Sequence, residues 1–363
     1  PAGRITIGLL FGLAVMLLGE WRIRAFKNQG AVLLALGAGV VLLTIFAAQT
    51  FYHFFTPLLG LGISFLSVVF IALSSVRHES RSLAALALVL ASISPVLAGY
   101  SQNDVVWLFS YLFVVALGAL LVAAFTGWRF LAPTSLAFVA LYFLSTSNSF
   151  TYRAESGITI LLMFSFAFSF LYYAANIIAI LKSDHAEQAD LLTAGANGLL
   201  LLLWVSVAAP DVWKSSIIAV LALIYAVGAF IIFQTHKRSE PIFIYSGIAI
   251  LMLGVATAME LHGAMLTIAY ILEAGLLTLG TAILGESTAI RKVSLLFIIP
   301  IVLSLGSIVT NSWRTGIFHS DFAVLFLLMV VLAILGIFFS SQTDAGNTEA
   351  ERSALHTSFT GAG

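Results

Sequence analysis

The chain contains no cysteine. This absence excludes disulfide bonds, metal or iron–sulfur sites built from thiolates, and cysteine nucleophiles. Charged residues are also scarce, since only 9% of the 363 residues are Asp, Glu, Lys or Arg, against about 25% in a typical soluble domain. Basic and acidic residues balance at 16 each, so no net positive field is available to neutralise phosphates. The composition therefore excludes a soluble enzyme, a disordered chain and a nucleic-acid-binding protein.

Sequence signatures of enzymes are missing as well. The chain has no H-E-x-x-H, G-x-S-x-G or G-K-S/T motif. A membrane glycosyltransferase would need acidic residues in sizeable external loops, whereas the few acids between the apolar segments lie in separate short connections. We therefore predict no catalytic residue, no metal site and no cofactor, and we favour a protein without enzymatic activity.

Apolar residues are abundant: they make up 61% of the chain, and the mean hydropathy is +1.09. A helix needs about 20 apolar residues to span a bilayer. Suitable segments are found at 5–21, 31–52, 57–76, 82–100, 105–126, 129–146, 157–181, 189–208, 215–234, 241–259, 263–284, 291–310 and 320–340. We predict an all-α fold, a polytopic transmembrane helical bundle of about 13 spans. Its single domain covers residues 1–340, and the polar residues 341–363 form a flexible cytoplasmic tail.

The basic residues support this count, because most of them fall on one side of the predicted membrane. That side holds Arg22, Arg24, Lys27, Arg77, Arg81, Arg129, Lys182, Lys237, Arg238, Arg291, Lys292 and Arg352. The other side holds Arg4, Arg153, Lys214 and Arg314. Cytoplasmic loops carry the Lys/Arg excess, so the C-terminus is expected in the cytoplasm and Pro1 outside. Tryptophans lie near predicted span ends, where indole rings prefer to be, and only Trp204 lies further in.

Several short motifs occur in an order that resembles a known family. They are Gly19-Glu20-Trp21-Arg22-Ile23-Arg24, Ala47-Ala48 with Phe51-Tyr52-His53, Ser94-Pro95-Val96-Leu97, Leu108-Phe109-Ser110-Tyr111, Trp128-Arg129-Phe130-Leu131 and the run from Leu266 to Gly275. The chain resembles the predicted bacterial membrane proteins of the Domain of Unknown Function 2339 family over about two thirds of its length. Tyr270 stands where that family more often has Trp.

The resemblance implies a multi-pass protein of the bacterial inner membrane, and it carries over no biochemical activity. Members usually have further spans upstream of the segment that begins here at Arg4. We therefore expect at least one more span, making fourteen, in the complete protein. That span would cover the small-residue face that Gly8 and Gly12 present on the first predicted helix.

Glu273 is the most informative polar residue. It lies eleven positions into the span 263–284, which corresponds to a depth of about 16 Å at 1.5 Å per residue. An ionised side chain there costs on the order of 2.5–3.5 kcal/mol. Tyr270 and Thr267 lie near the same helix face, and we predict an intramembrane polar site of Glu273, Tyr270 and Thr267. The site marks a substrate or proton pathway, or it is a packing contact; the sequence leaves both open.

Weaker candidates are spread over other segments. Glu260 and His262 close an external hairpin, where they form a small titratable cluster or an ordinary wetted loop. Gln49 and His53, one turn apart, are predicted to face a cavity. Asn176 is a polar residue inside an apolar span, and we favour a packing role for it over ligand binding.

One further polar residue, Glu20, is expected to pair at the cytoplasmic interface with its chain neighbours Arg22 and Arg24.

The first functional hypothesis is a transporter- or flippase-like protein, and the alternative is a non-catalytic scaffold. A transporter- or flippase-like role is favoured by the number of spans, by Glu273 and by Pro95 and Pro300, which are predicted to kink their spans. The scarcity of buried charge favours a non-catalytic scaffold or assembly subunit of an envelope complex. A membrane enzyme acting on lipid-linked substrates ranks last. A polar cavity reaching Glu273 would favour transport, and a dry bundle would favour the scaffold. Membrane lipids and other membrane proteins are the expected partners.

Overall fold

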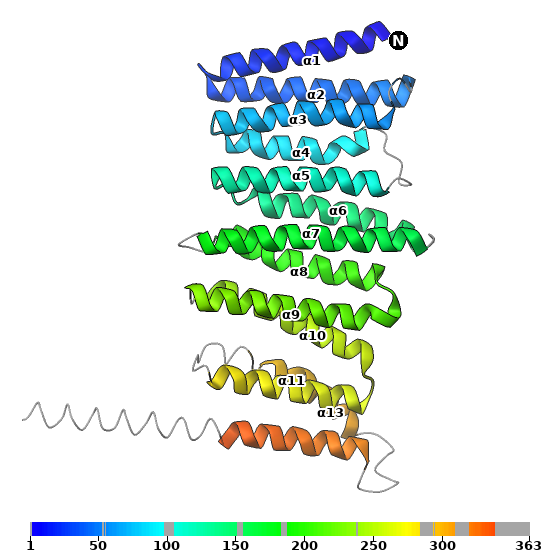
Figure 1. The fold of residues 1–363 in the computed structure, drawn as a ribbon, viewed down its shortest axis with the longest axis vertical. Helices are drawn as coiled ribbons and strands as arrows, with labels where there is room; N and C mark the ends of the chain where they lie inside the picture. Colours follow the sequence, from blue (N-terminus) through cyan, green and yellow to red (C-terminus); the bar gives the residue numbers. More distant parts are fainter. Residues whose placement is uncertain are drawn as a thin grey trace, which may run out of the picture. The chain divides into compact units, whose positions relative to one another are not determined.

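In the computed structural model, the described part of the chain comprises residues 2–52, 54, 56–97, 105–150, 155–182, 187–236, 239–283, 293, 295–308 and 319–337. These residues form helices joined by short connections (Figure 1). The chain divides into two compact units, residues 1–252 and 253–363, which we call unit 1 and unit 2. The predicted tail, residues 341–363, lies outside the described residues, so the boundary at 340 and the flexibility of the tail stay predictions.

Each predicted apolar segment contains a described helix. Unit 1 holds α1 (Ala2–Ile23), α2 (Lys27–Tyr52), α3 (Pro57–Arg77), α4 (Arg81–Leu97), α5 (Val105–Thr126), α6 (Leu131–Phe150), α7 (Glu155–Lys182), α8 (Gln188–Ala208), α9 (Asp211–His236) and most of α10 (Ser239–Glu260). Unit 2 holds α11 (Ala264–Ile283), the 3₁₀ turn η1 (Leu295–Phe297), α13 (Ile298–Ile308) and the helix Ser320–Ile337.

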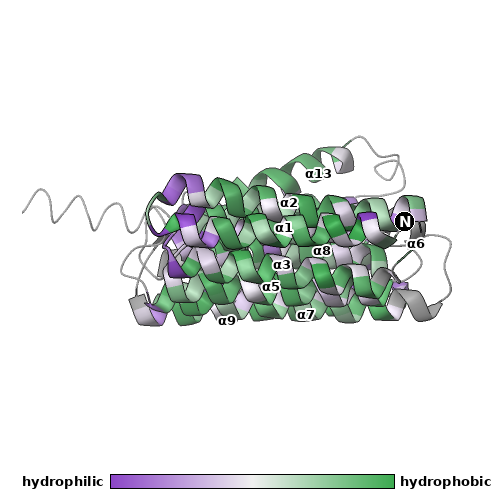
Figure 2. Ribbon diagram, turned by 90° about the horizontal axis from the view of Figure 1, so that it is seen from above, coloured by the Kyte–Doolittle hydropathy of each residue, from purple (hydrophilic) through white to green (hydrophobic). Residues whose placement is uncertain are grey.

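Within the described residues, nine helices are long and apolar enough to cross a membrane, and four shorter apolar helices, α4, α6, α11 and the η1–α13 segment, accompany them. Figure 2 shows hydrophobic residues along the helices and hydrophilic ones mainly at their ends. The protein is therefore an all-α polytopic membrane protein, as the sequence predicts.

Local chemistry explains where several helices begin and end. Thr56 caps α3, because its side-chain oxygen accepts a hydrogen bond from the Leu59 N–H group at 3.4 Å. Pro57 takes the first helical position, where its missing N–H group costs nothing. Gly127 follows α5 with a φ of 74°, a left-handed conformation that glycine adopts without strain.

The two prolines expected to kink their spans lie close to helix ends. Pro95 is two residues from the end of α4 at Leu97. Pro300 lies in the first turn of α13, directly after the 3₁₀ turn η1. A proline in the first turn of a helix removes no intrahelical hydrogen bond. Pro300 therefore marks where the predicted span 291–310 changes helix type.

The helices of unit 1 pack in two layers that follow chain order (Figure 1). In one layer α2 packs on α4, α4 on α6 and α6 on α8; in the other α5 packs on α7 and α7 on α9. Each helix from α1 to α8 also packs against the next helix in the chain. Close backbone packing in unit 1 thus joins helices one or two places apart in the chain, as far as the described residues extend.

Glycines bring α1 and α2 together. A Cβ atom added to Gly37 would lie 2.8 Å from the carbonyl oxygen of Gly12, and one added to Gly19 would lie 3.0 Å from that of Gly30. Small residues permit this close approach of two backbones. The small-residue face predicted at Gly8 and Gly12 is therefore confirmed. It packs against α2, so the face that a further helix was expected to cover is already occupied.

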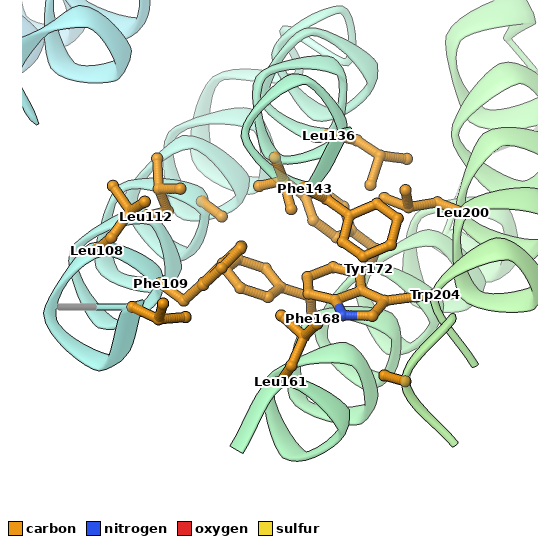
Figure 3. Packing of buried hydrophobic residues seen from close by; sticks show 14 of the residues in the cluster. Leu108, Phe109, Leu112, Leu136, Phe143, Leu161, Phe168, Tyr172, Leu200 and Trp204 are labelled. Atoms are coloured by element: carbon orange, nitrogen blue, oxygen red, sulfur yellow. The ribbon is translucent and has the colours of Figure 1, made fainter. Parts of the chain in front are cut away.

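An aromatic cluster fills the core between α5, α6, α7 and α8 (Figure 3). At its centre lies Trp204, of which only 1% is exposed. Its ring stacks on Phe143 with the ring centroids 4.6 Å apart, and Phe109 and Phe168 lie 5.5 and 6.0 Å away. The indole nitrogen has no hydrogen-bond partner among the described residues. The one tryptophan predicted to lie inside a span is therefore a packing residue.

Unit 2 has a smaller core. Ala274 of α11, Phe297 of η1 and Leu335 of the last helix are its buried members. Gly275 allows the last helix to approach α11, because a Cβ atom added there would lie 2.9 Å from Val331. These contacts hold α11 against the elements that follow it, and two of its polar side chains, Tyr270 and Glu273, bond to α10.

Candidate functional site

Two of the three residues in the polar site predicted on α11 are bonded to α10. Glu273 is half-buried and accepts a hydrogen bond of 2.5 Å from the Thr257 hydroxyl group. One turn earlier, the Tyr270 hydroxyl group donates to the carbonyl oxygen of Gly254 at 2.8 Å. Thr267 is buried, and its hydroxyl group is 3.4 Å from the carbonyl oxygen of Gly263 in the turn before α11. Glu273 and Tyr270 therefore join α10 to α11 by polar bonds, whereas Thr267 bonds to the turn that precedes its own helix.

The weaker candidates in this region lie at the end of the hairpin. Glu260 is the last residue of α10, and His262 lies in the connection to α11. Both side chains are exposed. Gly263 follows with a φ of 61°, which allows the tight turn. The titratable cluster proposed for these residues stays a prediction.

Asn176 of α7 is the best-connected of the predicted polar residues. It is buried, its Nδ2 atom donates to the carbonyl oxygen of Asp190 at 2.8 Å, and its Oδ1 atom accepts from the Tyr245 hydroxyl group at 2.8 Å. These bonds join α7 to α8 and to α10. Tyr172 and Tyr173, one turn earlier on α7, bond elsewhere, to Ser135 and to the carbonyl oxygen of Ile224. Asn176 thus uses both ends of its amide for packing.

A second amide, Asn197 of α8, makes a parallel connection. Its Nδ2 atom donates to the carbonyl oxygen of Ser169 and to the Tyr225 hydroxyl oxygen, each at 3.1 Å, and its Oδ1 atom accepts from the Ser169 hydroxyl group at 3.2 Å. The rings of Tyr173, Tyr225 and Tyr245 pack around these bonds with centroids 5.3–5.7 Å apart. Together the two amides tie four consecutive helices, α7 to α10.

A buried ion pair closes this network at the end of the helices. Asp190, in the first turn of α8, is 4% exposed and pairs with Arg129, which lies between α5 and α6. Arg129 also donates to the carbonyl oxygen of Ala179 at 3.3 Å, and its Nε atom lies 3.6 Å from the exposed carboxylate of Glu187. The arginine therefore connects three segments of unit 1 at the basic end of the helices.

Glu20 bonds to α3 and the turn after it, which corrects the expectation that it pairs with Arg22 and Arg24. Its carboxylate accepts from the Ser74 hydroxyl group at 2.5 Å and lies 3.0 Å from the Nε2 atom of His78. Arg22 instead lies over the ring of Phe26, 4.4 Å from its centroid. The reason is the close packing of α1, α2 and α3, which brings Glu20 to the end of α3.

Of the last pair of candidates, Gln49 and His53, the structure describes only Gln49. Gln49, near the end of α2, is half-buried. His53 lies outside the described residues, so their predicted common cavity stays a prediction.

Two clefts elsewhere in unit 1 have almost wholly apolar linings. We name these clefts by the helices at their sides. The α3–α5 cleft has a volume of about 320 Å³ and lies over α4. The α1–α3 cleft has a volume of about 330 Å³ and lies beside α2. Glu273 belongs to the lining of neither cleft.

The comparison with protein families decides the affiliation. A family model described as "Predicted membrane protein (DUF2339)" matches residues 1–355. The chain belongs to this family. The resemblance drawn from the motifs of the DUF2339 family is therefore confirmed, and the match extends beyond the two thirds expected. No curated protein and no solved structure matches this DUF2339 chain.

Sequence reasoning missed Arg129, Asp190 and Asn197, which form much of the buried polar network of this DUF2339 protein. A signal for two of them was present: Asp190 and Asn197 fall within the apolar segment 189–208, seven residues apart, and so lie on one helix face. Arg129 gave no such signal, because a basic residue between two spans is ordinary. The observed arrangement holds helices together, since its buried polar groups bond to one another.

Proposed function

We propose that this membrane protein is a non-catalytic scaffold or assembly subunit of a membrane complex in the bacterial envelope. The observation that carries the proposal is the packing of unit 1 in chain order. A transporter needs helices arranged around a substrate site that can open to either side. The helices of unit 1 form two layers side by side, so their outer faces are the surfaces available for interaction.

The buried polar groups of unit 1 support the same function. Asn176, Asn197 and Asp190 bond to neighbouring helices and fix the positions of α7 to α10. Polar side chains at a substrate pathway would instead point into a cavity. The clefts in unit 1 have apolar linings. A rigid framework with apolar outer faces is what a scaffold requires.

Both layers offer exposed apolar side chains for contact with lipid or protein. Leu43 of α2 and Leu141 of α6 are exposed on one layer, and Phe125 of α5 and Phe170 of α7 on the other. Exposed apolar surface of this kind faces lipid or binds another membrane protein. The two possibilities can be separated by placing a photo-crosslinking amino acid at each position in turn in living cells.

A scaffold should give a protein adduct of the same mass at both positions of one layer, and lipid adducts alone at the two matched positions of the other. Removal of the chain from cells should then reduce the amount of the assembled partner complex. Lipid adducts alone at all four positions would contradict the proposal, as would an unchanged amount of assembled partner.

Glu273 supports a second candidate, a transporter- or flippase-like role. It is a half-buried acid inside a span, and it accepts a hydrogen bond from the Thr257 hydroxyl group of the neighbouring helix. If this acid relays protons, vesicles containing the purified protein and a pH-sensitive dye should show proton flux under an imposed pH gradient. Glu273→Gln should abolish the flux, whereas Glu260→Gln, at the exposed end of α10, should not. Absence of flux, or equal flux in all variants, would exclude this role.

A further inference from the structure

The α3–α5 cleft is a gap in one layer of unit 1. α4 forms its floor with the small side chains Ala84, Ala87 and Ala91, and Gly118 of α5 adds further space. A Cβ atom added to Gly118 would meet nothing within 4 Å. The lining along α3 runs from Phe65 to Val76, a length of about 16 Å. The cleft is therefore an apolar channel that runs parallel to the helices.

Basic side chains lie at one end of this cleft. Its lining ends on α3 at Ser75 and Val76, and Arg77 follows directly. The Arg77 side chain is 65% exposed, and one of its guanidinium nitrogens lies 3.8 Å from the Glu20 carboxylate, which leaves its other N–H groups available to a phosphate. On α4 the lining begins at Ala84, which lies one turn after the exposed Arg81 and on the same helix face. The apolar channel thus leads to two exposed guanidinium groups.

We propose that the α3–α5 cleft binds an anionic glycerophospholipid, with one acyl chain in the channel and the phosphate group at Arg77 and Arg81. A cleft lined by apolar side chains within a membrane protein is filled by hydrocarbon, since water there would lose its hydrogen bonds. Basic residues at the membrane surface attract anionic lipids, and guanidinium groups bind phosphate oxygens in pairs of hydrogen bonds. The two parts of the ligand therefore match the two parts of the site.

The size of the cleft favours an acyl chain over a helix of a partner protein. A helix with side chains is about 10 Å wide, so a stretch 16 Å long would occupy roughly 1,300 Å³. The cleft offers about 320 Å³, which is within the range of about 300–1,000 Å³ found for small-molecule sites.

The α1–α3 cleft provides an internal comparison. It has nearly the same volume, but on α3 its lining ends at Phe70, seven residues before Arg77. Hydrocarbon can fill it, but the nearest basic residues on α1 and α3, Arg4, Arg22 and Arg77, lie at least five positions beyond its lining, whereas Arg77 directly follows the lining of the α3–α5 cleft. A preference for anionic headgroups should therefore depend on the α3–α5 cleft alone.

Native mass spectrometry of the purified full chain tests the proposal, with phosphatidylglycerol as the anionic probe and phosphatidylcholine as the zwitterionic one. We expect one tightly bound phosphatidylglycerol and at least tenfold weaker phosphatidylcholine binding. The double variant Arg77→Gln/Arg81→Gln should lose this preference, whereas Arg4→Gln should keep it. Gly118→Phe should fill the channel and weaken binding about tenfold. Gly62→Phe, at an exposed glycine of α3 outside both clefts, should bind as the unchanged protein does.

Several results would overturn the proposal. One is an anionic preference that survives in Arg77→Gln/Arg81→Gln, and another is unchanged phosphatidylglycerol binding in Gly118→Phe. A photo-crosslinker at Leu117 that captures a protein helix in place of lipid would give the cleft a different occupant. If Gly118→Phe does not fold, the arginine double variant still decides the question. These measurements use the isolated chain, so they do not depend on the proposed scaffold role.

Discussion

Tyr245 donates a hydrogen bond of 2.8 Å to the Oδ1 atom of Asn176, although the two residues are 69 positions apart in the chain. The bond joins α10 to α7 across the tyrosine cluster. Asn176 holds Asp190 with its other end, so a single amide connects three helices. The stability of unit 1 therefore depends on Asn176, a polar residue within an otherwise apolar span.

We predict that Tyr245→Phe lowers the free energy of unfolding of the purified protein by about 0.6–1 kcal/mol, the usual value of one buried hydrogen bond. Asn176→Leu should cost more, because it leaves the Tyr245 hydroxyl group unpaired and also removes the bond to the Asp190 carbonyl oxygen. Thermal unfolding in mild detergent measures both. Tyr52→Phe, at an exposed tyrosine near the end of α2, is the matched control and should have no effect. Equal losses for all three variants would contradict the prediction.

The ion pair of Arg129 and Asp190 gives a second prediction. Asp190→Ala should destabilise the protein by on the order of 3 kcal/mol, because Arg129 is then left largely buried without its main acidic partner. Glu187→Gln should cost under about 1 kcal/mol, since the Glu187 side chain is 55% exposed. The same unfolding assay compares the two. If Glu187→Gln lowered the free energy of unfolding as much as Asp190→Ala does, burial of the carboxylate would not determine how much each variant destabilises the protein.

Two glycines of α2 form a matched pair. A Cβ atom at Gly37 would lie 2.6 Å from the backbone nitrogen of Met16, whereas one at Gly39 would meet nothing within 4 Å. We expect Gly37→Ala to separate α1 from α2 and to cost about 1–3 kcal/mol. Gly39→Ala should be neutral, or stabilising by up to about 1 kcal/mol through helix propensity. Unfolding measurements that rank the two in the opposite order would refute the close approach.

The predicted topology can be tested because the chain has no cysteine of its own. Single cysteines placed at the exposed positions Asn28 and His262 should respond differently to a membrane-impermeant maleimide. His262→Cys should be labelled in cells with an intact inner membrane. Asn28→Cys should be labelled only after that membrane is permeabilised, since the basic side is expected in the cytoplasm. Labelling of Asn28→Cys alone in intact cells would invert the topology.

The sequence predicts the helices better than the contacts between them, and Glu20 shows why. Runs of apolar residues locate each span, because the thickness of the bilayer sets the length of a spanning helix. The partners of Glu20 depend on which helix lies beside α1, and the nearest basic residues in the chain, Arg22 and Arg24, suggested the wrong ones. Ser74 and His78 are more than 50 positions away. Pairings of this kind follow from packing, which hydropathy does not encode.

Gly8 and Asn176 illustrate what local patterns can and cannot predict. Small residues four positions apart predict a close helix contact, and α1 makes one, but the identity of α2 as the partner does not follow from the spacing. For Asn176, the favoured interpretation as a packing residue agrees with its bonds, yet Asp190 and Tyr245 could not be chosen as partners beforehand. The polar site at Glu273 keeps its dual interpretation, since a bond to Thr257 is compatible with either role.

The packing of unit 1 in chain order also affects how the protein can be made. Low contact order favours fast folding, and chains fold from the N-terminus as they are synthesised. When α4 enters the membrane, the helices α2 and α3 that it packs against are already there, and the same holds for each helix through α9. Assembly of unit 1 can therefore proceed during translation, because each new helix finds the earlier helices that it packs against already in the membrane.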